Sequence, residues 1–203
     1  MPEKEITVIS LGGSLIAPKT GFNIPFLKSF KQIIVKFLED NHRFIIVCGG
    51  GNTARLYQAA ALEVGELTAE DIDWIGIHAT RLNAHFIRTL FRAYAHPVVV
   101  KEYSLLDQIQ WKEQILVGAG WKPGWSTDYD SVLLARQYSV RRVINLSNIA
   151  YVYDSAPRVN AQAKKIEKMK WSEFRNLVGN TWDPGANVPF DPVASREAEA
   201  LGL

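Results

Sequence analysis

Three glycine-rich turns are the first feature of this sequence that could do chemistry. Each follows an apolar run typical of a buried strand, and they are Gly12-Gly13-Ser14, Gly49-Gly50-Gly51-Asn52 and residues 118–127. A glycine turn lets the backbone approach a ligand and point successive N–H groups at it, and a following helix adds positive potential for an anion. Double glycines also make plain turns, but three of them after strands favour a phosphorylated ligand.

Arg55 adds a cation to the second turn. It lies one helical turn after Gly51, so its guanidinium could reach the same anion as the loop amides, and its planar fork suits phosphate oxygens. A solvated helix arginine is the plainer interpretation. The sequence contains neither GxxxxGK[ST] nor a clean GxGxxG, so we expect neither a P-loop nor a standard dinucleotide fold.

The third turn carries hydroxyls and a carboxylate. Pro123-Gly124 predicts a tight turn, and Ser126 or Thr127 can cap the helix that follows. Asp128 then falls in the first helical turn, where the helix dipole favours a carboxylate in any case. Asp128 could instead orient Mg²⁺ or a catalytic cation, and its spacing does not separate the two roles.

Aromatic and histidine side chains are weaker candidates. Five aromatic residues could stack on a base, although loop aromatics more often pack: Trp121, Trp125, Tyr151, Tyr153 and Trp182. His78 and His85 share one face of an expected helix, which favours ordinary packing over a site.

The elements that must position these residues alternate along the chain. Apolar, β-branched runs predict strands at 6–11, 44–48, 98–100, 115–117 and 143–146, with a sixth candidate at 150–153. Helical spacing and caps predict helices at 25–40, 52–62, 68–94, 105–110, 128–138, 171–178 and 191–201. This alternation predicts an α/β fold with a mainly parallel sheet covered by helices on both faces. Ligands bind at the carboxyl ends of strands in such sheets, which is where the glycine turns fall.

The composition is that of an ordinary globular protein. The 203 residues are 47% apolar and 22% charged, with a net charge of +2, so we expect a single domain without bulk attraction to nucleic acid. The single cysteine, Cys48, excludes an intrachain disulfide, and four histidines without an HxxxH spacing argue against a His-built metal site. No apolar run approaches the roughly 20 residues of a membrane helix, and residues 1–10 do not read as a signal peptide. We therefore expect a cytoplasmic protein without a membrane partner.

Six stretches extend the glycine turns into a recognisable pattern. They are SLGGSL at 10–15, GGGNTAR at 49–55, DWIGIHATRLNAH at 73–85, GWKPGWSTD at 120–128, SNIAYVYDSAPR at 147–158 and FDPVASREA at 190–198. Together they resemble the amino acid kinase superfamily, specifically uridylate (UMP) kinases of the archaeal type. Their order and spacing cover nearly the whole chain.

The resemblance implies a three-layer αβα sandwich around a largely parallel sheet, assembled as a homo-oligomer, a hexamer. It implies transfer of the γ-phosphoryl group of ATP-Mg²⁺ to UMP, giving UDP and ADP, with Mg²⁺ carried by ATP and no metal site of the protein's own. Such a transfer needs in-line placement and charge neutralisation more than a nucleophilic side chain. Within one domain, residues up to roughly 140 would hold UMP and residues 141–203 would hold ATP.

The resemblance also implies roles for individual residues. Arg55 and Asp128 would be catalytic, with the carboxylate as an organising group. The residues expected to bind UMP are Gly50, Asp73, Trp121, Lys122, Pro123, Gly124, Trp125, Ser126 and Thr127. Those expected to bind ATP are Gly13, Ser14, Gly51, Arg55, Ser147, Asn148 and Tyr153.

The chain departs from the family pattern at several positions. Ser10 stands where many relatives carry lysine, and Arg196 aligns with a family lysine near the end. Ala150 and Tyr151 replace an aspartate and a glycine, and Ala156 replaces a further acid. These changes fall mainly in the part expected to bind ATP.

Two alternatives to an active UMP kinase stay open. The first is a degenerate nucleotide-binding or storage protein on the same fold, which the changes at 147–156 would suit. The second is another small-phosphate kinase, such as isopentenyl phosphate kinase, but that family places a histidine in the glycine loop and this loop runs Asn52-Thr53-Ala54-Arg55. The chain ends at Leu203, where relatives usually continue with another strand and helix, so it is either a short member or a fragment.

Overall fold

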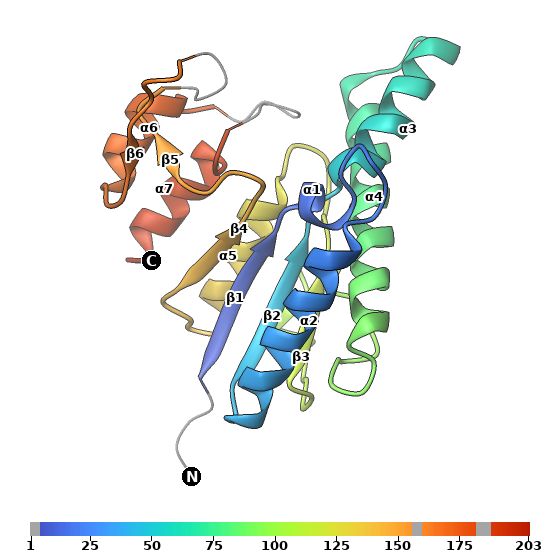
Figure 1. The fold of residues 1–203 in the computed structure, drawn as a ribbon. Helices are drawn as coiled ribbons and strands as arrows, with labels where there is room; N and C mark the ends of the chain where they lie inside the picture. Colours follow the sequence, from blue (N-terminus) through green and yellow to red (C-terminus); the bar gives the residue numbers. More distant parts are fainter. Residues whose placement is uncertain (1–4, 156–159, 182–187) are drawn as a thin grey trace.

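A four-stranded sheet forms the centre of the computed structural model, which describes residues 5–155, 160–181 and 188–203 (Figure 1). Its strands are β1 (Ile6–Leu11), β2 (Arg43–Cys48), β3 (Ile115–Gly118) and β4 (Val143–Leu146), in the order β3-β2-β1-β4. Every pairing is parallel, and Leu11 lies opposite both Cys48 and Leu146. Because these strands end at one edge, the turns that follow them are neighbours.

Several helices of the described residues begin at side-chain caps. The helices in the described ranges are α1 (Gly13–Ile16), α2 (Ile24–Glu39), α3 (Gly51–Val64), α4 (Ala69–Leu90), α5 (Thr127–Gln137), α6 (Trp171–Val178), α7 (Pro192–Ala200) and the short 3-10 helix η1 (Leu106–Gln108). Thr68 and Asp71 cap α4 reciprocally, each side chain accepting the backbone N–H of the other. Ser126 caps α5 and Asp191 caps α7.

Helices cover both faces of the sheet because its strands are apolar on both sides. On one face, Ile9 and Ile46 pack against α2 and α4. On the other face, Val8 and Ile45 pack against α5. Burial on both faces is typical of central parallel strands. The predicted three-layer αβα architecture is therefore confirmed.

A smaller lobe follows β4. Two short antiparallel strands, β5 (Val152–Tyr153) and β6 (Lys165–Ile166), lie with α6 and α7 on the β4 side of the sheet (Figure 1). Phe174 of α6 and Ala194 of α7 share an apolar cluster with Val132 of α5. This cluster joins the lobe to the sheet.

The strand predicted at 98–100 is reduced to an isolated bridge between Val100 and Gly118. Pro97 has no N–H to donate to a ladder, and the side chain of Val98 is exposed to solvent. Residues 98–100 therefore add no strand to the sheet, and the third strand along the chain is β3.

Two predicted helices also differ in extent. The helix predicted at 105–110 shortens to η1. The helix predicted to start at Asn52 starts at Gly51, with Gly50 as its N-cap. None of the helices in the described ranges is long and apolar enough to cross a membrane.

Candidate active site at the carboxyl edge of the sheet

The first two glycine turns touch each other. A Cβ on Gly13 would lie 2.1 Å from the Gly51 nitrogen, and a Cβ on Gly51 would lie 2.2 Å from the Gly13 carbonyl oxygen. Gly51 also has a φ of +62°, which L side chains rarely adopt. Only glycine fits at either position, and the structure brings these two predicted ATP-binding residues together.

The start of α3 supplies amides and a cation at the same edge. Gly50 is the N-cap of α3, so the free N–H groups of the first helical turn open beside Gly13. Asn52 is an exception, because its N–H donates to the Ala17 carbonyl at 3.1 Å. Arg55 is exposed one turn into the helix and forms no ion pair with any described residue. Its charge is therefore available to an anion at this end of α3.

The loop after β3 is held by α4, and this brings more of the predicted UMP-binding residues together. Asp73 accepts the Gly124 N–H at 2.8 Å. Arg81 donates from Nη2 to the Trp121 carbonyl at 2.8 Å. Pro123 lies between these two points, and Thr127 is the first residue of α5. Asp73 and the loop therefore belong to one site.

The aromatic side chains of this loop pack against one another. The rings of Trp121 and Trp125 have centroids 5.3 Å apart, and the Lys122 ammonium lies over both of them. Tyr103 contacts the first ring and Tyr129 the second. These contacts favour the packing interpretation of the two tryptophans over a free stacking surface.

Asp128 lies in a hydrogen-bond network that ties three elements together. Its Oδ1 accepts from the Ser10 hydroxyl of β1 at 2.8 Å, and its Oδ2 accepts the Asp191 N–H at 3.0 Å. Asp191 also accepts from the hydroxyl of Ser126. Burial raises the pKa of Asp128 to about 6, while the two hydrogen bonds lower it and the charge of Asp191 raises it. The carboxyl group therefore changes charge close to neutral pH, as groups at functional sites often do.

Three residues of this edge were missed by the sequence analysis. They are Asp191, which holds Asp128, and two residues of α4, Arg81 and Asn83. The Asn83 amide donates to the carbonyls of Gly49 and Gly50 at 2.8 and 3.1 Å. In the sequence, these three residues are marked only by lying inside the family-like stretches at 73–85 and 190–198.

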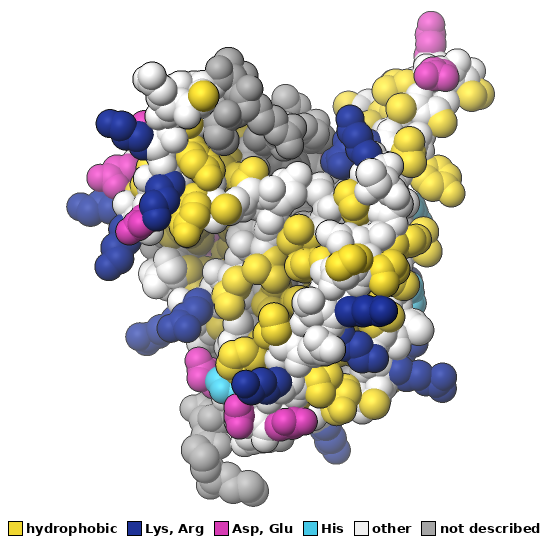
Figure 2. Space-filling model, in the orientation of Figure 1, with side chains coloured by type: hydrophobic (Ala, Val, Ile, Leu, Met, Phe, Trp, Pro, Cys, Tyr) yellow, Lys and Arg dark blue, Asp and Glu magenta, His cyan; other side chains and the backbone are white. Residues whose placement is uncertain are grey.

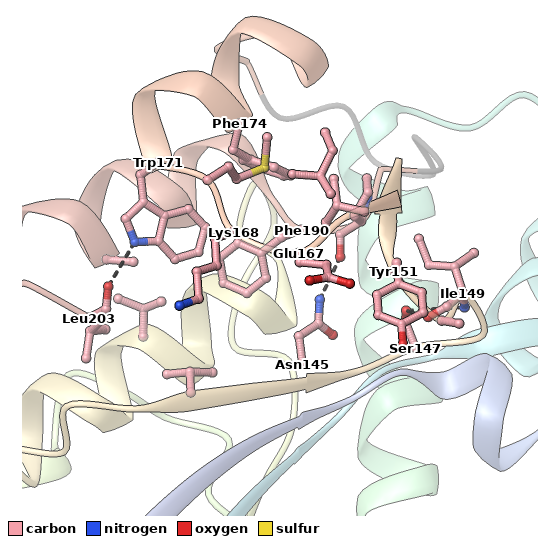
Figure 3. A pocket seen from close by; sticks show the side chains of 18 residues that line it. Asn145, Ser147, Ile149, Tyr151, Glu167, Lys168, Trp171, Phe174, Phe190 and Leu203 are labelled. Atoms are coloured by element: carbon pink, nitrogen blue, oxygen red, sulfur yellow. Dashed lines mark hydrogen bonds between the residues drawn. The ribbon is translucent and has the colours of Figure 1, made fainter. Parts of the chain in front are cut away.

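The predicted ATP-binding residues converge only in part. Ser14 is half-buried at the first glycine turn, and Ser147 lies beside this turn, since a Cβ on Gly12 would lie 3.5 Å from the Ser147 Cα. Ser147 follows β4 and lines a cavity of about 660 Å³ (Figure 3). Asn148 is exposed and Tyr153 lies in β5, and neither of them lines that cavity. Trp182 and Ala156 fall outside the described residues.

This cavity lies between β4 and the smaller lobe (Figure 3). Its walls are mainly apolar and include Val143 of β4, Trp171, Phe174 and Phe190. The Asn145 side chain at its floor is already bonded to the Pro189 carbonyl at 2.6 Å. Such walls suit an apolar or aromatic group better than a phosphate.

Comparisons with known proteins agree with this geometry. The model of the amino acid kinase family matches residues 5–202. The uridylate kinase of Methanococcus aeolicus is 33% identical over 190 residues, which cover 93% of this chain and 84% of the relative. The uridylate kinase of Thermococcus kodakarensis is 35% identical over 162 residues, which cover 80% of this chain and 71% of the relative.

Solved structures show the same fold. The uridylate kinase from Archaeoglobus fulgidus superimposes with a TM-score of 0.81 and 28% identity, covering 97% of this chain and 87% of that one. Aspartate kinase from Synechocystis has a TM-score of 0.75 at 13% identity, covering 98% of this chain and 36% of that one, which shows a shared fold. The predicted resemblance is confirmed, and the chain belongs to the amino acid kinase family.

Proposed function

We propose that this protein is a UMP kinase, which transfers the γ-phosphoryl group of ATP-Mg²⁺ to UMP and gives UDP and ADP. Relatives named uridylate kinase match 93% of the chain at 33% and 35% identity. The observation that carries the proposal is the contact between Gly13 and Gly51. It sets two groups of backbone amides side by side, and phosphoryl transfer needs two phosphates placed in line.

The acceptor nucleotide would lie between α3 and the loop after β3. The amide of Gly50, the N-cap of α3, would hold the phosphate of UMP. Arg55, exposed in the second turn of α3, would lie between the two nucleotides and contact the phosphates of ATP. The resemblance gives Asp73 the ribose. Its carboxylate accepts the Gly124 N–H and so lies beside the loop that would surround the nucleoside. Residues 121–127 would surround the uracil.

The donor nucleotide would lie across the glycine turns. Gly13, Ser14 and Gly51 would hold the phosphates of ATP, with its base toward Ser147, Asn148 and Tyr153. Residues up to roughly 140 would thus serve mainly UMP, and residues 141–203 mainly ATP. This division follows the family resemblance and the position of the smaller lobe beside β4.

Mg²⁺ would arrive with ATP and neutralise charge on the phosphate oxygens. Asp128 and Ser10 offer the hard oxygen atoms that Mg²⁺ prefers, so the residues present fit this ion. Asp128 would orient the cation when ionised, and Arg55 would stabilise the charge that spreads over the transferring oxygens.

A panel of acceptors tests the proposed function. Turnover of ATP is measured in a coupled assay with UMP, CMP, dUMP and isopentenyl phosphate. Turnover with UMP above the others is expected. Turnover with isopentenyl phosphate but not with UMP would assign the site to another small-phosphate kinase.

A nucleotide-binding protein without turnover is the second candidate function. Ser10 stands where many relatives have lysine, and no lysine or arginine among the described residues hydrogen-bonds or pairs with Asp128. Titration calorimetry with ATP and UMP separates the two candidates. Binding of both nucleotides without formation of UDP would support the second.

We further propose that the protein is a homo-oligomer, which the resemblance gives as a hexamer, and that copies meet on the outer face of α3 and α4. Leu56 is 63% exposed and Val64 is 90% exposed on α3, and Leu82 of α4 is also exposed. Figure 2 shows hydrophobic side chains along the projecting end of these helices. A contiguous apolar surface of this kind favours a protein partner over water.

A further inference from the structure

The backbone N–H and C=O groups of Gly120 and Trp121 are held by side chains from two helices, α4 and α5. The Gly120 N–H donates to Oγ1 of Thr80 at 2.8 Å, and its carbonyl accepts from Nε of Arg81 at 3.3 Å. The Trp121 carbonyl accepts from Nη2 of Arg81 at 2.8 Å, and its N–H donates to Oδ2 of Asp130 at 3.3 Å. The loop after β3 therefore begins from two residues, Gly120 and Trp121, whose backbone N–H and C=O groups all have hydrogen-bond partners.

Burial makes this arrangement stiff. The side chains of Thr80 and Asp130 are buried, so water does not compete for these hydrogen bonds. A Cβ on Gly120 would lie 2.9 Å from Oγ1 of Thr80, so the backbone and α4 are in direct contact. Burial raises the pKa of Asp130, while the Trp121 N–H and the charge of Arg81 lower it.

The same helix also holds the second glycine turn. Asn83 donates to the carbonyls of Gly49 and Gly50 at 2.8 and 3.1 Å, and its side chain is buried. Arg81 and Asn83 lie within one turn of α4, and a helix changes its length little. One turn of α4 therefore fixes the distance between the phosphate end and the nucleoside end of the acceptor site.

We infer that Arg81 and Asn83 are positioning residues for UMP, with Arg81 setting the loop around the nucleoside and Asn83 setting the turn around the phosphate. This inference rests on the proposed function. Neither side chain needs to touch the nucleotide, because each acts through backbone carbonyls. The fork of Arg81 is suited to this task because it reaches two successive carbonyls at once.

Steady-state kinetics of Arg81→Ala and Arg81→Lys test the inference. Arg81→Ala should raise the KM for UMP about tenfold, the cost of one or two charge-assisted hydrogen bonds, and change the KM for ATP less than about twofold. Arg81→Lys keeps the charge beside Asp130 but cannot bond both carbonyls, so its KM for UMP should lie in between. Asn83→Ala should also raise the KM for UMP selectively.

Arg88→Ala is the matched control. Arg88 is half-buried on the same helix and also donates to a backbone carbonyl, that of Pro97, but this hydrogen bond is exposed and lies about two helical turns beyond Arg81. Its KM values should equal those of the original chain. An unchanged KM for UMP in folded Arg81→Lys, or an equal rise of both KM values in the Arg81 variants, would overturn the inference.

Amide hydrogen exchange separates this inference from the proposed function. Exchange at Gly120 and Trp121 should be faster in Arg81→Lys than in the original chain, even without nucleotide. If the original chain does not phosphorylate UMP, the proposed function fails, and the exchange rates still decide whether Arg81 fixes the loop. Unchanged exchange at Gly120 and Trp121 would refute the role of Arg81 in holding the loop.

Discussion

Asp128 is the residue whose ionisation should matter most to turnover. Its pKa is about 6 in the folded chain against 3.8 in an unfolded one, so the native state binds the extra proton between these values. Stability contributed by the neutral carboxyl is therefore present below about pH 4 and lost as the pH rises through about 6. Ionisation of Asp128, which a cation-orienting role requires, therefore lowers the stability of the folded chain.

We predict that kcat/KM for UMP falls by about tenfold between pH 7 and pH 5, as the fraction of ionised Asp128 in the free enzyme falls. The pH profile of kcat/KM measures this inflection. Asp128→Asn keeps the shape of the side chain but cannot ionise, so its lower rate should show no inflection near pH 6. An inflection that survives in this variant would assign the titration to another group.

Arg55 should carry much of the interaction with phosphate. Arg55→Ala is expected to lower UMP-dependent turnover by roughly tenfold or more, because a charge-assisted contact to phosphate is lost. Arg92→Ala, which removes an exposed arginine beyond the end of α4, is the control and should keep the original rate. Unchanged kinetics in Arg55→Ala would count against the position given to Arg55.

Between elements, the contact of α1 with α3 depends on two glycines. Gly13→Ala places a Cβ against the Gly51 backbone, so we predict a loss of roughly 1–3 kcal/mol in the free energy of unfolding together with weaker binding of ATP. Gly65→Ala adds a Cβ in open space and should change that free energy by less than about 0.5 kcal/mol. Urea unfolding and ATP titration measure the two effects. Wild-type stability in Gly13→Ala would contradict the contact.

The elements with continuous apolar runs were predictable from sequence. The runs at 6–11, 44–48 and 115–117 became largely buried parallel strands, because burial on both faces stabilises such runs. The run at 143–146 became the edge strand β4, in which Ile144 is 38% exposed. The run at 98–100 failed, since Pro97 interrupts pairing and Val98 faces solvent. Hydrophobicity alone does not reveal whether a partner strand is available.

The polar contacts of the site were much less predictable. Arg81 and Asn83 read as ordinary polar positions of an amphipathic helix, and their partners lie 33 to 40 residues away in the sequence. The sequence predicts Asp191 only as the first residue of a helix at 191–201; in the structure it is the N-cap, and its N–H bond to Asp128 depends on how the smaller lobe docks. Such contacts are set by tertiary packing, on which local spacing carries no information.

At the scale of the whole molecule, one end of the α3–α4 pair extends beyond the rest of the fold (Figure 1). The two helices pack on each other, and their outer ends project beyond the sheet (Figure 1). Large apolar side chains on these helices are exposed, among them Leu56, Val64 and Leu82. A second copy of the chain would cover them and would stiffen the helix that carries Arg81 and Asn83, so assembly would support the acceptor site.

We predict that Leu56→Asp lowers the mass of the protein in solution, because burying an unpaired carboxylate in an interface is costly. Sedimentation velocity measures the mass. Ile33→Asp is the matched control, since Ile33 is 56% exposed against 63% for Leu56 but lies on α2. A variant at Leu56 that keeps the original mass, or an Ile33 variant that loses it equally, would place the interface elsewhere. If the assembly supports the acceptor site, Leu56→Asp should also raise the KM for UMP more than that for ATP.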